Sequence, residues 1–154
     1  MKVRRATRKD SGEIVNMACE FEMYLLKIDN ALIQESPPKA TFRKFLSKGL
    51  DDGHHAVFVA QDGKRLVGFA DLWVIPEFLH GGMSGYMTNL FVRDGVRGKG
   101  VGRALLAQVV REAKRRKVVA LHVPVKPKNA KAVAFYRKMG IDEQLYMMET
   151  RLDR

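Results

Sequence analysis

The chain is poor in cysteine, the residue that stabilises many small folds through disulfides or bound metal ions. It contains a single cysteine, Cys19, so a framework of intrachain disulfides is excluded and no cysteine cluster can hold a metal. We expect Cys19 to be a small core residue of the first helix. Residues 1–8 lack the apolar block of a signal peptide, and no apolar run approaches the length of a membrane span. The sequence therefore predicts a soluble, cytoplasmic protein without a membrane partner or a metal site.

Acidic residues are also scarce, with 17 Asp and Glu against 28 Lys and Arg and a net charge of +11. A surface this basic attracts phosphates of any origin, so a nucleic-acid-binding module is an alternative interpretation. The basic run from Arg111 to Lys117 closes an amphipathic helix, however, where cations complement the negative end of the helix dipole. The sequence has no repeated basic-plus-aromatic pattern of the kind that stacks bases. We therefore do not favour nucleic acid as the partner.

The length of 154 residues and an apolar content of 46% fit one domain over residues 1–154 that buries about two-thirds of its unfolded surface. A capping box at Asp10–Glu13 and the hairpin signal Asp62-Gly63 mark two element boundaries. The predicted strands are 3–6, 56–60, 65–75, 86–92, 119–123 and 146–152. The predicted helices are 11–27, 39–48 (after Ser36-Pro37-Pro38), 100–117 and one beginning at Asn129, and 76–85 is a flexible loop. Strands 86–92 and 119–123 flank a helix and should pair in parallel. We expect an α/β fold with a mixed sheet of about six to seven strands, a central parallel pair and about four helices.

The most informative segment is the Gly- and Arg-rich turn between Val92 and Arg103. An apolar strand enters it and an amphipathic helix leaves it, which is how backbone N–H groups at a helix start form an anion site. Residues 100–103 lack the Lys-Ser/Thr pair of a Walker loop, and Arg103 stands where a dinucleotide fingerprint needs its third glycine. The pattern that fits is Arg97-x-x-Gly100-x-Gly102, which suits a pyrophosphate.

This pattern resembles the acetyl-CoA pyrophosphate loop of the GCN5-related N-acetyltransferases (GNAT). A second segment, residues 129–141, is similar to the last helix of that family, Asn-x-x-Ala-x-x-(Leu/Phe)-Tyr-x-Lys-x-Gly-Phe, with Ile141 in place of the final aromatic residue. The resemblance covers at least residues 86–152. It implies the GNAT fold and transfer of an acetyl group from acetyl-CoA, as co-substrate, to a primary amine in a ternary complex.

The resemblance also implies roles for individual residues. The pantetheine arm of the cofactor would pair with Leu90, Phe91 and Val92, and the Leu90 N–H would stabilise the oxyanion. Tyr136 matches the tyrosine that protonates the departing thiolate, and a phenol suits that role. Asn129 would orient the cofactor while capping its helix. The cofactor-binding residues are Leu90, Phe91, Val92, Arg97, Gly98, Lys99, Gly100, Val101, Gly102, Arg103, Asn129 and Tyr136.

The resemblance does not supply a general base, because many relatives carry a carboxylate where this chain has Thr88 and Asn89. Asp71 is the first candidate, since it shares strand parity with Trp73 on a neighbouring strand. Glu77 and His80 come next, although a surface or strand-end role is the favoured interpretation of all three. His54 and His55 are predicted to be exposed turn residues, and His122 has no metal-like spacing to a partner.

The identity of the acceptor amine is open between a small molecule and a protein amine. The family's acceptor side corresponds to residues 21–42, 76–85 and 142–146, with carboxylates at Glu20, Glu22, Asp29 and Glu35 that would suit a cation. The missing carboxylate at Thr88 and Asn89 keeps a second interpretation open, a CoA-binding regulatory domain without turnover. Dimers are common in the family, so a homodimer is also open.

Overall fold

The computed structural model describes residues 1–29, 39–79, 81–150 and 152. Contacts within the chain divide it into two compact units, residues 1–123 and residues 124–154. A single domain over the whole chain stays a prediction. No helix among the described residues is both long enough and apolar enough to cross a membrane.

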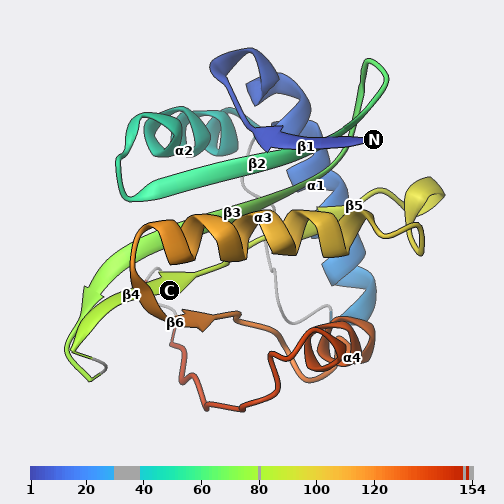
Figure 1. The fold of residues 1–154 in the computed structure, drawn as a ribbon. Helices are drawn as coiled ribbons and strands as arrows, with labels where there is room; N and C mark the ends of the chain where they lie inside the picture. The colour runs from blue at the N-terminus through green and yellow to red at the C-terminus, as the bar shows by residue number, and fades with distance from the viewer. Residues whose placement is uncertain (30–38, 80, 151, 153–154) are drawn as a thin grey trace. The chain divides into compact units, whose positions relative to one another are not determined.

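The first unit is built on a six-stranded mixed sheet with the order β1-β2-β3-β4-β6, in which β5 pairs with β3 beyond the end of β4 (Figure 1). All neighbours are antiparallel except β4 and β6, which run parallel. The strands are β1 (Lys2–Arg5), β2 (His55–Asp62), β3 (Arg65–Glu77), β4 (Gly82–Tyr86), β5 (Leu90–Val92) and β6 (Val118–His122). The helices are α1 (Ser11–Ile28), α2 (Lys39–Asp51) and α3 (Val101–Arg115) in the first unit and α4 (Ala130–Lys138) in the second. The predicted α/β class, with its parallel pair and four helices, is confirmed.

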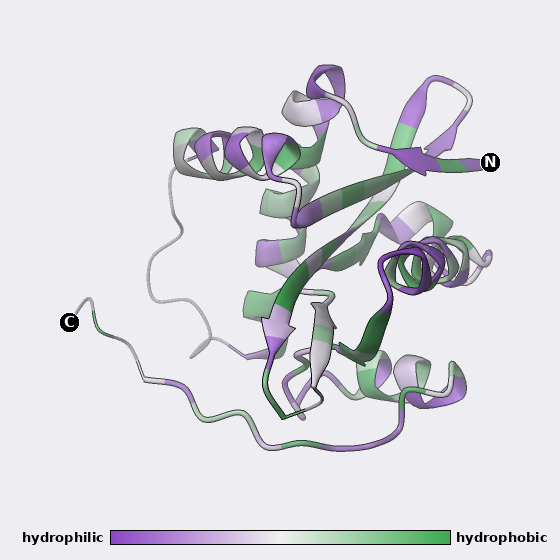
Figure 2. Cartoon of the chain, turned by 60° about the vertical axis from the view of Figure 1, so that its left-hand side comes forward, coloured by the Kyte–Doolittle hydropathy of each residue, from purple (hydrophilic) through white to green (hydrophobic). Residues whose placement is uncertain are grey.

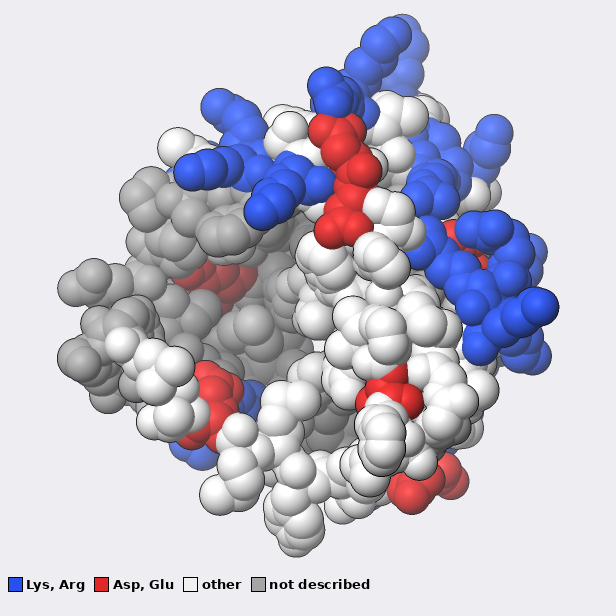
Figure 3. Space-filling model, turned by 90° about the vertical axis from the view of Figure 1, so that its left-hand side faces the viewer, with Lys and Arg blue, Asp and Glu red and all other residues white. Residues whose placement is uncertain are grey.

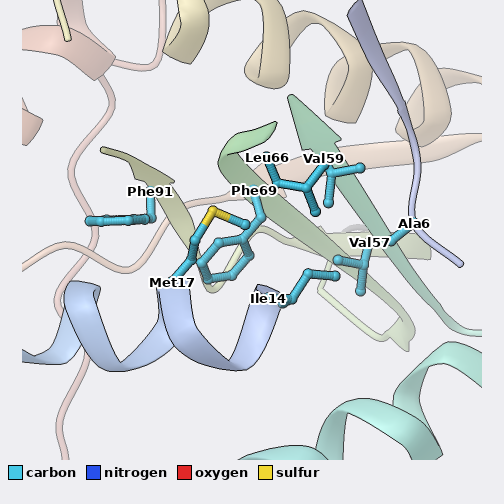
Figure 4. Close-up of a cluster of buried hydrophobic side chains, with 8 residues drawn as sticks. All are labelled: Ala6, Ile14, Met17, Val57, Val59, Leu66, Phe69 and Phe91. Carbon is cyan, nitrogen blue, oxygen red and sulfur yellow. The ribbon is translucent and has the colours of Figure 1, made fainter. Parts of the chain in front are cut away.

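Helices cover both faces of this sheet because its strands alternate apolar side chains between the two sides. Figure 2 shows β2 and β3 as hydrophobic over most of their length, as expected of strands buried on two faces. On one face Met17 of α1 packs with Val57 and Phe69, as Figure 4 shows. On the opposite face α3 lies across β2 and β3, and its Leu105 is fully buried.

The predicted flexible loop over residues 76–85 is wrong, because β3 continues to Glu77 and β4 begins at Gly82. Gly85 in this segment is required by close packing. A Cβ built on Gly85 would lie 3.0 Å from Leu72 and 3.2 Å from Val118, so the parallel β4–β6 pair leaves no room for a side chain.

Two further local predictions are also wrong. Residues 141–150 form no strand, and the side chains of Tyr146 and Met148 are exposed. The apolar residues there are consecutive rather than alternating, so they do not form the one-sided face that a strand buries. The capping box begins at Thr7 instead of Asp10, since the Asp10 carboxylate accepts hydrogen bonds from the Thr7 N–H and hydroxyl at 2.8 and 2.9 Å.

The basic run at the end of α3 surrounds one buried carboxylate, Glu112. Figure 3 shows Lys and Arg gathered over the upper and right-hand parts of one face of the molecule. Glu112 is 8% exposed and accepts hydrogen bonds from Arg115 at 2.7 Å and from Arg116 at 2.8 Å. The hydrogen bond from Arg115, reinforced by Arg116, lowers the pKa of Glu112 to about 2 although burial opposes the shift.

This depressed pKa predicts a loss of stability in acid. Because the folded-state pKa lies below the unfolded one, Glu112 stabilises the fold above a pH of about 4.5 and loses that contribution as the pH falls toward 2. We expect Glu112→Gln to remove about 2–3 kcal/mol of unfolding free energy at pH 7 and to flatten its decline between pH 4.5 and 2. Urea denaturation at several pH values measures this, with Glu143→Gln, an exposed carboxylate of the second unit, as control. An unchanged pH slope in Glu112→Gln would contradict the assignment.

Candidate functional site

A β-bulge interrupts the strand that runs beside β3. Tyr86 of β4 pairs with Trp73 and Leu90 of β5 pairs with Ala70, so three residues on one side oppose two on the other. The extra residue lies within the segment 87–89, and it offsets β5 from β4.

The carboxylate of Asp71 stabilises this bulge by accepting hydrogen bonds from it. Its Oδ1 accepts hydrogen bonds from the backbone N–H of Thr88 at 3.0 Å and of Asn89 at 2.8 Å. Its Oδ2 accepts from the Thr88 hydroxyl at 2.8 Å and from the Asn89 side-chain amide at 2.9 Å. Asp71 is 5% exposed, and these contacts favour a positioning role, while its role as a general base stays a prediction.

Beyond the bulge, β5 presents backbone groups on an edge that pairs with no described strand. Hydrogen bonds from Asp71 N–H to the Asn89 carbonyl and from Arg93 N–H to the Val67 carbonyl tie odd-numbered residues to β3. Hydrogen-bonding directions alternate along a strand, so Leu90 and Val92 point their N–H and C=O groups away from β3. We call this side of residues 90–92 the open edge of β5.

The open edge begins where β4 and β6 end. The parallel ladder closes at the Tyr86–His122 pair, and the Met87 N–H donates to the His122 carbonyl at 2.9 Å. β5 then pairs with β3 alone among the described strands. An extended ligand could therefore add itself to the open edge as a further strand.

The glycine-rich turn leads from the open edge to the start of α3. Gly98 and Gly100 have φ values of 78° and 82°, a left-handed conformation that side chains disfavour. The first helical hydrogen bond runs from the Ala104 N–H to the Gly100 carbonyl, so the three preceding N–H groups project from the helix end. Lys99 and Arg103 are exposed beside them.

Arg97, the first residue of the predicted phosphate pattern, makes three contacts with other groups of the protein. Its guanidinium lies 4.4 Å from the centre of the Tyr24 ring and 2.5 Å from a carboxylate oxygen of Asp94. Its Nε donates to the Val92 carbonyl at 2.8 Å. Arg97 therefore links the turn to α1 and to the open edge of β5.

A polar cluster lies next to the point where the parallel strands end. His122 Nε2 is 3.6 Å from Glu77 Oε2, and the Ser84 hydroxyl donates to the same carboxylate oxygen. The Tyr86 ring stacks on the His122 ring with centroids 4.7 Å apart. Glu77 is a sequence candidate for the base, whereas its pairing with His122 depends on a strand register that the sequence does not show.

The remaining histidines fall in different places. His54 is exposed as predicted, but the prediction of an exposed His55 is wrong, because His55 is 6% exposed at the start of β2. His80 lies outside the described residues. Among the residues that the structure does describe, no group of three or more His, Cys, Asp or Glu side chains could hold a metal ion.

A cleft of about 580 Å³ lies between α1 and β5, on the predicted acceptor side. Its lining includes Tyr24, Phe91 and Glu20. Glu20 forms an ion pair with Arg93 at 2.7 Å, and Arg93 also pairs with Glu13, so Glu20 is already engaged within the protein. Glu35, another predicted acceptor carboxylate, lies outside the described residues.

In the second unit, α4 carries the other predicted motif. The Asn129 side chain accepts a hydrogen bond from the Ala132 N–H at 3.3 Å, which confirms it as the N-cap. Tyr136 lies on this helix edge-on to Phe135, with ring centroids 5.3 Å apart. Gly140, with φ 81°, follows the helix end.

Comparison with known proteins places the chain in a family. The model of the Acetyltransferase (GNAT) family matches residues 21–141, and the chain belongs to this family. Proteins of the family use acetyl-CoA as co-substrate.

Individual relatives agree with this assignment. The chain is 32% identical over 98 residues to a glucosamine 6-phosphate N-acetyltransferase from Trypanosoma brucei brucei, with 63% of each chain covered. An aminoglycoside acetyltransferase from an uncultured soil metagenomic sample has a similar fold, with TM-score 0.79, 20% identity, and coverage of 99% of this chain and 96% of that one. A predicted acetyltransferase with acetyl-CoA from Clostridium acetobutylicum gives TM-score 0.79, 20% identity, and coverage of 98% and 96%.

Proposed function

We propose that this protein is an acetyl-CoA-dependent N-acetyltransferase that transfers the acetyl group to a primary amine by direct attack in a ternary complex. The observation that carries the proposal is the open edge of β5, where the Leu90 N–H faces away from β3 immediately beside the glycine-rich turn. One backbone surface thereby offers a strand-like edge for a pantetheine arm and N–H groups for a pyrophosphate.

The cofactor is bound mainly through the main chain in this account. The pantetheine arm pairs with the open edge, and the pyrophosphate accepts hydrogen bonds from the turn and the first N–H groups of α3. Lys99 and Arg103 add positive charge near the phosphates. In the first unit the set is Leu90, Phe91, Val92, Arg97, Gly98, Lys99, Gly100, Val101, Gly102 and Arg103. Asn129 and Tyr136 are proposed on the resemblance of residues 129–141 alone.

The reaction needs an amine that has lost its proton, an oxyanion site and a proton for the thiolate. We assign removal of the amine proton to His122, the last residue of β6, because the open edge begins beside it; Glu77 fixes the His122 ring. The amine nitrogen then bonds to the thioester carbon, and the Leu90 N–H stabilises the oxyanion. The C–S bond breaks, and Tyr136 gives the thiolate its proton. The attacking nitrogen loses its second proton, which restores the Tyr136 hydroxyl through solvent, and the proton first taken from the ammonium leaves the base to solvent.

The acceptor is an amine in this proposal, and two relatives indicate which amines to test first. One is named for glucosamine 6-phosphate and another for aminoglycosides. The panel of candidate amines therefore begins with amino sugars and continues with peptides that have a free N-terminus or a lysine. The experiment measures release of coenzyme A from acetyl-CoA with each amine. If the protein binds acetyl-CoA but none of the amines causes release of coenzyme A, turnover is contradicted and a CoA-binding regulatory domain is favoured.

A matched pair of glycine substitutions tests the cofactor site. Gly100 and Gly140 have nearly the same φ, 82° and 81°, and a Cβ on either would meet no atom within 4 Å. An alanine therefore costs each site a similar backbone strain of about 1 kcal/mol. We expect Gly100→Ala to raise the dissociation constant for acetyl-CoA about tenfold, because its Cβ projects where the phosphates approach. Gly140→Ala should leave the constant unchanged, and equal constants for both variants by isothermal titration would contradict this site.

A further inference from the structure

His55 is a buried histidine to which the proposed reaction assigns no role. It begins β2 on the face of the sheet that carries Asp71, since Val57 pairs with Asp71 and His55 pairs with Trp73. Its ring stacks on the Trp73 indole with centroids 3.9 Å apart and planes within 10°. A buried imidazole needs hydrogen-bond partners, so each of its nitrogens must be accounted for.

The Nε2 atom of His55 lies within hydrogen-bonding distance of the Asp71 carboxylate, which stabilises the bulge. Nε2 lies 3.4 Å from Asp71 Oδ2, a long hydrogen bond between two buried side chains. Nδ1 has no hydrogen-bond partner in the part of the chain that the structure describes. It lies against Gly49 of α2, where an added Cβ would collide with it. This arrangement assigns the ring proton to Nε2, because the carboxylate there can only accept.

We propose that His55 is a positioning residue that acts on the open edge of β5 through Asp71. Its Nε2–H is a further donor to a carboxylate that already accepts from Thr88 and Asn89. Trp73 on one side and Gly49 on the other fix the imidazole, so the carboxylate keeps the orientation in which Oδ1 faces the two bulge amides. The bulge in turn sets the direction of the Leu90 N–H. Only this last step rests on the proposed function.

Two properties of the site support this chain of contacts. First, Asp71 is 5% exposed, and a buried carboxylate is tolerated where several donors surround it. Second, the other donors to Asp71 come from the bulge itself, whereas His55 comes from β2. His55 therefore ties the bulge to the rigid part of the sheet.

Amide hydrogen exchange at Thr88 and Asn89 in the free protein tests the proposal without any turnover. His55→Leu removes the donor, and His55→Gln replaces Nε2 by an amide of similar reach. We expect exchange at both amides to become about tenfold faster in His55→Leu and to return to within about twofold of wild type in His55→Gln. Rates are taken relative to the Phe58 amide in β2, so that a general loss of stability cancels.

Val59→Ala is the matched control, since Val59 is fully buried on the same strand and belongs to the core cluster with Phe69. It should lower global stability and leave the Thr88 and Asn89 ratios unchanged. If His55→Leu does not fold, His55→Asn serves instead, because its amide is too short to reach Asp71. Unchanged ratios in the folded variant, or equal rates in the Leu and Gln variants, would overturn the proposal.

Kinetics separates this proposal from the proposed function. In an active wild type, His55→Leu should raise the KM for acetyl-CoA and lower kcat about tenfold each, with both recovered in His55→Gln. Altered exchange with an inactive wild type would sustain the positioning role and refute the acetyltransferase. Wild-type kinetics and wild-type exchange in His55→Leu would refute the positioning role alone.

Discussion

Replacing His122 by Gln lowers kcat/KM for the amine about a hundredfold at pH 7, the usual contribution of a general base. The expectation follows from the His122–Glu77 pair beside the end of the β4–β6 ladder. At pH 7 an alkyl amine with a pKa of about 10 is almost wholly protonated, so a group that removes its proton controls the rate. The deficit should therefore shrink as the pH rises toward 10, where the free amine forms without help.

Two controls sharpen this measurement. Glu77→Gln should give a smaller loss of about tenfold, because it leaves the imidazole and removes only the group that orients it. His54→Gln changes an exposed histidine whose Nδ1 lies 3.2 Å from the Val74 carbonyl and should have no effect. A His122→Gln enzyme with wild-type activity at pH 7 would exclude His122 and return attention to Asp71.

Replacing Tyr136 by Phe lowers kcat about a hundredfold with little change in the KM for acetyl-CoA. The substitution removes only the hydroxyl, so the ring still packs against Phe135 and the fold of α4 is kept. The reason for the loss is the leaving group, because proton donation to the departing sulfur stabilises the transition state in which the C–S bond breaks. Steady-state kinetics with the best amine of the panel provides the measurement.

The control for this substitution is Met148→Leu, which changes an exposed side chain of the same unit outside the predicted acceptor side. It should behave as wild type. If Tyr136→Phe also keeps its full kcat, Tyr136 only packs near the cofactor and another group or water supplies the proton.

Elements and motifs whose signals are local could be predicted from the sequence. The turn 97–103 and the cap at Asn129 depend on residues within a few positions of one another, and the structure has both as helix starts. Helix α1 ends within one residue of its predicted limit for the same reason.

The parts of the site that sequence reasoning missed depend on strand register. His122 meets Glu77 only because β4 lies between β3 and β6 and pairs with both of them. His55 meets Asp71 through the β2–β3 hairpin, whose register shifts between Ala60 and Gln61. A shift of one residue turns every side chain of a strand to the other face. Contacts between side chains of different strands therefore cannot be predicted from the spacing of residues in the sequence. The shared parity of Trp73 and Asp71 predicts that both side chains lie on one face of β3, but it could not show the donors around the carboxylate.

The melting temperature with and without saturating acetyl-CoA tests whether this protein binds the cofactor. Ligand at about a hundred times its dissociation constant adds about 2.7 kcal/mol to the stability of the folded state. For a chain of this size we expect a rise of about 5–10 °C, reduced in Gly100→Ala and kept in Gly140→Ala. No rise at millimolar acetyl-CoA, together with a salt-sensitive rise on adding DNA or RNA, would contradict the cofactor site and make the basic surface the functional one.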